Sequence, residues 1–154
     1  MLGGLEDRSI DAVVISTPDH WHVPISLAAA RAGKDVYCEK PLSLYIREGR
    51  ALVNAARKYG RVVQHGTQQR TMEMNRFSCE LVRDGGIGEI RAVECVNFKG
   101  PIPYPAAGLA EEPVPQGVDW DLWQGQAPVH PFHHELFQHW TAKNGRWWGN
   151  WREY

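Results

Sequence analysis

The sequence predicts an α/β protein built on a parallel β-sheet, and three neighbouring segments support this fold class. Residues 11–16 form a continuous apolar run, which is typical of a strand buried on both faces. Residues 20–32 are predicted to form a helix that ends at Gly33, because glycine readily adopts the positive φ of a helix C′ position. Residues 35–38 form a second short strand. Together these segments make one right-handed βαβ unit with two parallel strands.

Two further elements extend this sheet. Residues 46–59 carry apolar side chains near helical spacing and are followed by Gly60, which predicts an amphipathic helix. Residues 61–64 are predicted to be the last strand of the sheet. Segments 17–22 and 39–41 follow adjacent strands, so we expect both at the C-terminal edge of the sheet. That edge is where open parallel sheets bind ligands.

The pattern changes after residue 70. Residues 72–84 predict another helix, and residues 90–98 alternate imperfectly between polar and apolar side chains. We therefore expect a domain boundary near residue 70, with one domain at 1–70. The start of an α+β domain, opening with a strand of a mixed or antiparallel sheet, is expected at 71–154.

Composition excludes some classes of function. The 154 residues carry a formal net charge of −1 without clustered Lys or Arg, which argues against nucleic acid as the main partner. No apolar run approaches the length of a membrane span, and no signal peptide opens the chain, so we expect a cytoplasmic protein with no membrane partner. Export stays open if the true N-terminus is missing. Cys38, Cys79 and Cys95 share no metal-ligand spacing and are expected to be free thiols.

Four segments in combination resemble the Gfo/Idh/MocA family, named after glucose-fructose oxidoreductase and inositol dehydrogenase. They are STPDHWH at 16–22, AGKDVY at 32–37, EKP at 39–41 and VVQHGTQQR at 62–70. The resemblance is close over about residues 10–70 and less decisive beyond. It implies that residues 1–70 are the C-terminal part of a Rossmann-type dinucleotide-binding domain for NAD or NADP. The later segment is then the start of the family's substrate domain.

Lys40 has the strongest functional case. Its ammonium beside the nicotinamide ribose could position the cofactor and hydrogen-bond the substrate oxygen that gains or loses a proton during hydride transfer. The alternative is a surface lysine in a loop between a strand and a helix. The resemblance also implies a cis peptide bond before Pro41. The expected cofactor-binding residues are Thr17, Pro18, His20, His22, Glu39, Lys40 and Pro41.

Two residues just past the last strand of the sheet, Gln68 and Arg70, are the expected substrate-binding residues. The resemblance implies an NAD(P)-dependent oxidoreductase acting on a sugar, cyclitol or related polyol, with a homo-oligomeric full-length protein. Two other functions stay open. One is a glycoside hydrolase that uses tightly held NAD for transient oxidation, and the other is a truncated remnant without catalysis.

Two signatures of the family are missing from the sequence. The chain has no Gly-rich turn of the kind that binds the pyrophosphate at a helix N-terminus. It also lacks the family's Gly-x-His-x-x-Asp stretch, whose His and Asp face the nicotinamide. We therefore expect an internal piece of a longer enzyme, which is inactive by itself.

Several histidines and tryptophans have open roles. We expect no metal site, because His20 and His22 have no third ligand at a helpful spacing. The His133, His134 and Glu135 cluster suggests a structural or exposed role rather than ligation. His65 faces the predicted cleft or is an ordinary satisfied histidine. The tryptophans, which either contact a sugar or fill a core, are Trp120, Trp123, Trp140, Trp147, Trp148 and Trp151.

Overall fold

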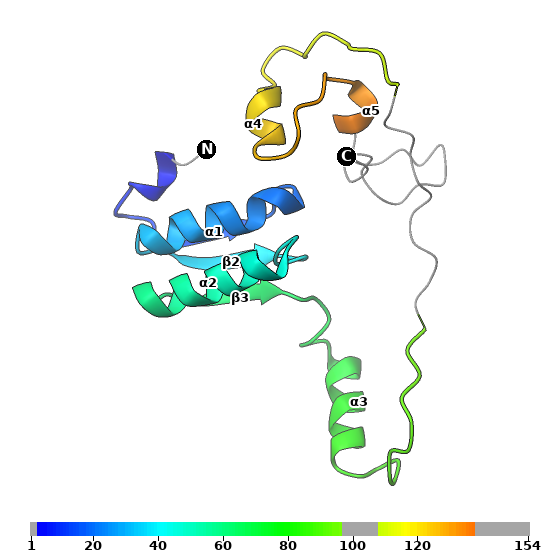
Figure 1. Ribbon diagram of the computed structural model, residues 1–154. Helices are drawn as coiled ribbons and strands as arrows, with labels where there is room; N and C mark the ends of the chain where they lie inside the picture. Colours follow the sequence, from blue (N-terminus) through cyan, green and yellow to red (C-terminus); the bar gives the residue numbers. More distant parts are fainter. Residues whose placement is uncertain (1–2, 97–107, 138–154) are drawn as a thin grey trace. The chain divides into compact units, whose positions relative to one another are not determined.

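The computed structural model describes residues 3–96 and 108–137 (Figure 1). The chain divides into two compact units, residues 1–92 and 93–154, and each is described separately. The first unit contains η1 (Gly3–Leu5), β1 (Ala12–Ile15), η2 (Asp19–Trp21), α1 (His22–Arg31), β2 (Asp35–Glu39), α2 (Ile46–Tyr59), β3 (Val63–Gly66) and α3 (Glu73–Arg83).

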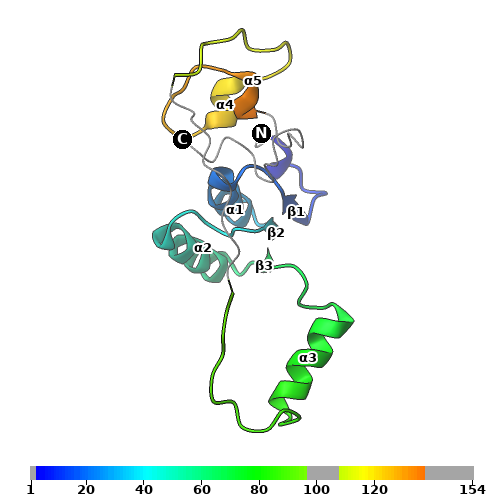
Figure 2. The ribbon, with the colours of Figure 1, turned by 90° about the vertical axis from the view of Figure 1, so that its right-hand side faces the viewer.

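The three strands form one parallel sheet in the order β1-β2-β3, as the sequence predicts. Ile15 of β1 lies beside Cys38 of β2, which lies beside His65 of β3. Because the strand order follows the chain order, right-handed crossovers place α1 and α2 on the same face of the sheet, which Figure 2 shows from the side.

The core of this unit lies between the sheet and α1. It contains the buried residues Ile15, Ala29, Val36 and Cys38, and partly buried apolar side chains pack around them. Ala29 and Ala30 are both fully buried, so the small side chains of α1 let the helix approach the strands closely. The βαβ unit is therefore held by apolar packing on one face of the sheet.

The opposite face of the sheet corrects one prediction. The apolar run at 11–16 predicts a strand buried on both faces, yet Ile15 is 2% exposed while Val14 is 74% exposed. The reason is the topology, since the two crossover helices cover the same face. Among the described residues of this unit, the face that carries Val14 stays accessible.

Two glycines and two hydrogen bonds organise the N-terminal edge of the sheet. Gly33 has φ of 80° and Gly60 has φ of 61°, so both helices end where the sequence predicts. The Asp35 carboxylate accepts a hydrogen bond from the Val62 amide at 2.9 Å, and Arg61 donates to the Gly33 carbonyl at 2.9 Å. Arg61 and Val62 make these contacts just before β3. The strand begins at Val63, two residues later than predicted.

The region after the sheet differs in part from the prediction. Helix α3 forms as expected and has no buried residue. The predicted strand at 90–98 is wrong for its described part, because residues 90–96 have no strand conformation. A strand needs a hydrogen-bonded neighbour, and no described residue pairs with this segment. Residues 97 and 98 lie outside the described residues.

The second unit is built around aromatic side chains. It contains α4 (Trp120–Gln124) and α5 (His134–Phe137). Trp120 stacks on Trp123 with ring centroids 4.7 Å apart and meets the ring of Phe132 edge-on, and its Nε1 donates to the His130 carbonyl at 2.8 Å. These two tryptophans share one helical turn, and Trp120 is buried in the core of this unit, which is one of the two predicted roles. The four later tryptophans lie outside the described residues.

No helix among the described residues combines the length and apolarity that crossing a membrane requires.

Candidate functional site

The segments that follow the three strands leave the sheet at one edge. Ile15, Cys38 and His65 lie side by side in the register, and Thr17, Lys40 and Thr67 each follow two residues later. This confirms the predicted arrangement of the two loops at the C-terminal ends of adjacent parallel strands. The local reason is the βαβ topology, in which every strand runs in the same direction.

Lys40 is exposed and lies where β2 leaves the sheet. The Lys40–Pro41 peptide bond is cis, as the resemblance implies. The backbone amide of Lys40 donates to Oε2 of Glu39 at 3.3 Å. The Glu39 carboxylate thus contacts the backbone of the loop that carries the ammonium.

Gly66 makes room for that carboxylate. It pairs with Glu39 in the register, and a Cβ at Gly66 would lie 3.1 Å from Oε1 of Glu39 and 2.9 Å from the Tyr37 hydroxyl. Sequence reasoning missed this role of Gly66. The available signal was a glycine at the end of a strand, where another group often approaches the backbone closely.

His22 begins α1 and is 1% exposed. Its Nδ1 lies 2.6 Å from the carbonyl oxygen of Pro41, and its Nε2 lies 2.9 Å from the carbonyl oxygen of Thr17. The ring therefore joins the segment after β1 to the segment after β2. Both nitrogens are engaged with backbone of this chain, which differs from the expected contact between His22 and a cofactor.

The environment of His22 favours the charged ring. Burial is the largest influence and opposes the charge, but the interaction with Cys38 and the hydrogen bonds to the Pro41 and Thr17 carbonyls outweigh it. Together they raise the pKa of His22 to about 9. The contacts of the ring therefore favour its protonated form over its neutral form.

Two buried polar atoms at this edge have no hydrogen-bond partner among the described residues. They are Oγ1 of Thr17, at the end of β1, and Nε2 of His65, in β3. Buried polar groups are nearly always paired, and these two atoms are shielded from solvent by the chain itself. The cofactor contact of Thr17 and the role of His65 therefore stay predictions.

The other expected cofactor residues surround Thr17. Pro18 is half-buried and precedes η2, with φ of −55° and ψ of 150°. His20 is buried within η2, and its ring centroid lies 6.1 Å from that of Trp21. The structure thus brings Thr17, Pro18 and His20 together in one short turn.

The expected substrate residues lie on the loop after β3. Gln68 and Arg70 are both exposed. Gln68 and Gln69 each have φ of 57°, a conformation that non-glycine residues rarely adopt. The side-chain amide of Asn75 donates to the Gln69 carbonyl at 3.0 Å, which ties this turn to α3. Unusual backbone conformations of this kind concentrate at ligand-binding sites.

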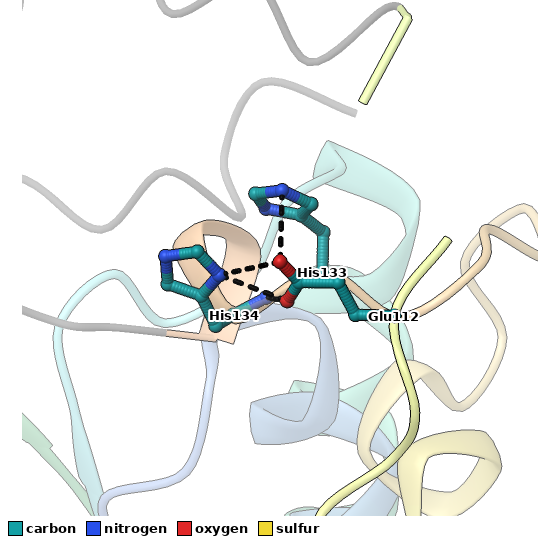
Figure 3. A group of neighbouring side chains, drawn as sticks. All are labelled: Glu112, His133 and His134. Atoms are coloured by element: carbon teal, nitrogen blue, oxygen red, sulfur yellow. Dashed lines mark hydrogen bonds and ion pairs between the residues drawn. The ribbon is translucent and has the colours of Figure 1, made fainter. Parts of the chain in front are cut away.

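A second group of side chains lies in the second unit (Figure 3). Glu112 lies against two stacked histidines, with its carboxylate 2.8 Å from Nδ1 of His134 and 3.4 Å from Nε2 of His133. The His134 amide also donates to this carboxylate at 2.8 Å, and hydrogen bonding to His134 lowers the pKa of Glu112. The sequence indicated a structural role for the histidines but missed their partner, which lies about twenty residues earlier.

The three side chains of this group offer ligand atoms within 4.8 Å of one another, a spacing that would allow a metal ion. The Glu135 amide donates to Nδ1 of His133 at 3.2 Å, which places the proton of a neutral ring on Nε2, facing Glu112. If His133 bound a metal through Nε2, its proton would lie on Nδ1 and would be donated to an acceptor. Here Nδ1 accepts a hydrogen bond instead. The geometry therefore fits a carboxylate held by two imidazoles.

Comparisons with known proteins give one family and several similar oxidoreductases. Residues 4–67 match the Gfo/Idh/MocA family, described as an oxidoreductase family with an NAD-binding Rossmann fold. The chain is 34% identical to inositol 2-dehydrogenase 3 of Saccharopolyspora erythraea over 117 residues, which are 74% of this chain and 35% of that protein. It is 39% identical to 1,5-anhydro-D-fructose reductase of Ensifer adhaerens over 82 residues, which are 53% of this chain and 25% of that protein.

A solved structure agrees with these relatives. Apo scyllo-inositol dehydrogenase from Lactobacillus casei superposes with a TM-score of 0.52 at 30% sequence identity. The match covers 56% of this chain and 26% of that structure. The chain thus spans between a quarter and about a third of the length of the proteins to which it is similar.

Proposed function

Residues 4–67 of this chain belong to the Gfo/Idh/MocA oxidoreductase family, and from this premise we propose that the chain forms one wall of the active site of an NAD(P)-dependent oxidoreductase. The proposed reaction passes a hydride between a carbinol carbon of a sugar, cyclitol or related polyol and the nicotinamide. The names of two relatives, an inositol dehydrogenase and an anhydrofructose reductase, support this substrate class. In this proposal, residues 1–70 are part of the dinucleotide-binding domain and residues 71–154 begin the substrate domain.

The observation that carries the proposal is that Thr17 and Lys40 follow the C-terminal ends of two adjacent parallel strands. Dinucleotides bind at this edge in Rossmann-type folds. The geometry therefore supports a cofactor at this edge independently of the sequence similarity.

Lys40 is the proposed catalytic residue. Its ammonium donates a hydrogen bond to the substrate oxygen that becomes a carbonyl or a hydroxyl, and it stabilises negative charge developing there. The Lys40 ammonium can act on the substrate only if the loop after β2 holds it in a fixed place. The Glu39 carboxylate supports this loop by accepting a hydrogen bond from the Lys40 amide. The next residue, Pro41, is held through its carbonyl by the His22 ring.

The turn that contains Thr17, Pro18 and His20 forms the proposed cofactor wall. When bound, NAD or NADP accepts or supplies the hydride. The Thr17 hydroxyl is a hydrogen-bond donor and acceptor for the cofactor, and the ring of Pro18 offers an apolar surface beside it. Gln68 and Arg70, on the strained turn after β3, are the proposed substrate-side residues.

The uncovered face of the sheet supports the proposal that further strands and helices complete the domain. β1 is an edge strand of the sheet, and Val14 on its uncovered face is 74% exposed. An exposed apolar edge strand or face normally pairs with further structure or associates. In the proposed complete enzyme, the first half of the dinucleotide-binding domain pairs with β1.

The test is hydride transfer by the complete enzyme that contains this chain. A polyol carrying deuterium on its carbinol carbon is incubated with NAD or NADP, and the deuterium content of the reduced cofactor is measured. Deuterium at the nicotinamide supports the proposal. Release of a free sugar from a glycoside without net cofactor reduction would instead identify the glycoside hydrolase that the sequence also allows.

A further inference from the structure

The ring of His22 lies between two backbone carbonyl groups. Nδ1 is 2.6 Å from the Pro41 oxygen and Nε2 is 2.9 Å from the Thr17 oxygen, with the residue 1% exposed. These partners are 19 and 5 residues away along the chain. A side chain on α1 therefore makes polar contacts with both loops of the sheet edge at once.

The protonation state follows from the partners. A carbonyl oxygen accepts hydrogen bonds and has no proton to donate. A neutral imidazole carries a proton on one nitrogen and a lone pair on the other, so one of the two contacts would then join a lone pair to an oxygen at hydrogen-bond distance. The imidazolium ion donates from both nitrogens and satisfies both carbonyls.

We infer that His22 is a buried imidazolium clamp that holds the Thr17 and Pro41 segments together and thereby positions Lys40. The inference makes His22 a positioning residue, and its link to catalysis rests on the proposed function of Lys40. The clamp acts through the backbone, because Pro41 directly follows Lys40 and its carbonyl is one of the two oxygens held. Neither ring nitrogen of His22 is left to donate to a bound molecule.

The surroundings of the ring explain how a charge is kept inside the fold. Taking a cation out of water is costly unless hydrogen bonds compensate it, and charge-assisted bonds are about twice as strong as neutral ones. The loops contribute the two uncharged carbonyls, and β2 contributes the titratable Cys38 thiol, whose interaction with the ring favours its charged form. The Ser26 hydroxyl donates to the His22 carbonyl at 2.7 Å and supports the first turn of α1.

Glutamine is the informative replacement at this position. Its terminal amide donates from one nitrogen, while its other terminal atom is an acceptor. In the His22→Gln variant, one carbonyl therefore loses its donor and faces an oxygen instead. This loss affects the spacing of the two loops without adding volume to the core.

The first measurement is a long-range proton–nitrogen NMR spectrum of the 154-residue chain labelled with ¹⁵N-histidine, recorded from about pH 6 to about pH 10. We expect both nitrogens of His22 to be protonated and protected from exchange at neutral pH, with loss of one proton near the pKa of about 9. Free ¹⁵N-histidine in the same buffers is the reference for an exposed ring. A neutral His22 at neutral pH, or a His22 signal that behaves like an exposed histidine, would overturn the inference.

The second measurement compares backbone amide shifts of the chain with those of His22→Gln. The inference expects shifts at Thr17, Lys40 and Leu42, with little change at Ala55 in α2. Shifts confined to α1, with Lys40 unmoved, would mean that His22 does not position this loop. Because no cofactor is present in either measurement, the clamp can fail while the oxidoreductase proposal stands, and the deuterium transfer experiment tests that proposal separately.

Discussion

Glu39 and Gly66 lie opposite each other in the parallel pair β2 and β3, and the absence of a side chain at Gly66 leaves the space that the Glu39 carboxylate occupies. This relationship links the last strand of the sheet to the Lys40 loop, because the same carboxylate accepts from the Lys40 amide. The loop therefore depends on a backbone position in another strand.

Gly66→Ala should displace the Glu39 carboxylate with little loss of stability. The added Cβ meets the Tyr37 hydroxyl and Glu39 Oε1, which are the ends of mobile side chains, so the free energy of unfolding should fall by about 1 kcal/mol or less. Urea denaturation measures the stability, and the amide shift of Lys40 reports the displacement. Gly3→Ala is the matched control, because a Cβ at Gly3 has no atom within 4 Å. An unmoved Lys40 amide would contradict the link.

Lys40→Ala in the complete enzyme should lower turnover by roughly 10²–10⁴-fold, the usual contribution of a general acid–base group. Cofactor affinity should change much less, because the rest of the cofactor wall stays intact. Steady-state kinetics with cofactor titration measures both quantities. Lys58→Ala, at the exposed end of α2, is the control lysine. If the variant turned over as fast as the unmodified enzyme, Lys40 would be a surface lysine without a catalytic role.

The raised pKa of His22 predicts that the folded chain loses stability at alkaline pH. Its pKa is raised in the folded state from 6.5 to about 9, so its contribution is fully present below the unfolded value and is lost as the pH rises through about 9. The contribution at neutral pH and below is on the order of 3 kcal/mol by linkage.

The measurement is urea denaturation of the chain and of His22→Gln at a series of pH values. The difference in free energy of unfolding between the two proteins should shrink between about pH 7 and about pH 10. Taking the difference removes the effect of other groups that titrate in this range. A difference that is independent of pH would mean that the ring is not charged in the folded state.

The chain by itself should not bind NAD or NADP with useful affinity. The sequence contains no Gly-rich turn, so the pyrophosphate would lack the backbone amides and the helix N-terminus that normally bind it. Calorimetric titration of the 154-residue chain should show no saturable binding below about millimolar concentration, the weak end of the affinity range. A clear micromolar isotherm would show that this half of the domain suffices for binding.

The local sequence determined much of this fold. Apolar runs and two glycines were enough to predict α1, α2 and the parallel strands, because helix and strand periods and positive-φ positions are properties of neighbouring residues. The same signals placed Thr17 and Lys40 at one edge, since parallel strands all end on the same side. The beginning of β3 was less accurate, because Arg61 contacts Gly33 in the turn after α1 and Val62 contacts Asp35 at the start of β2.

Tertiary structure decided which groups meet. The carbonyls of Thr17 and Pro41 reach His22, and the carboxylate of Glu112 reaches His134 across 22 residues of sequence. Periodicity shows which face of an element is apolar, but it carries no information about the distant donor or acceptor that packing brings to a given atom. The exposure of Val14 has the same origin, because burial of the second face of a strand depends on other segments that cover the sheet.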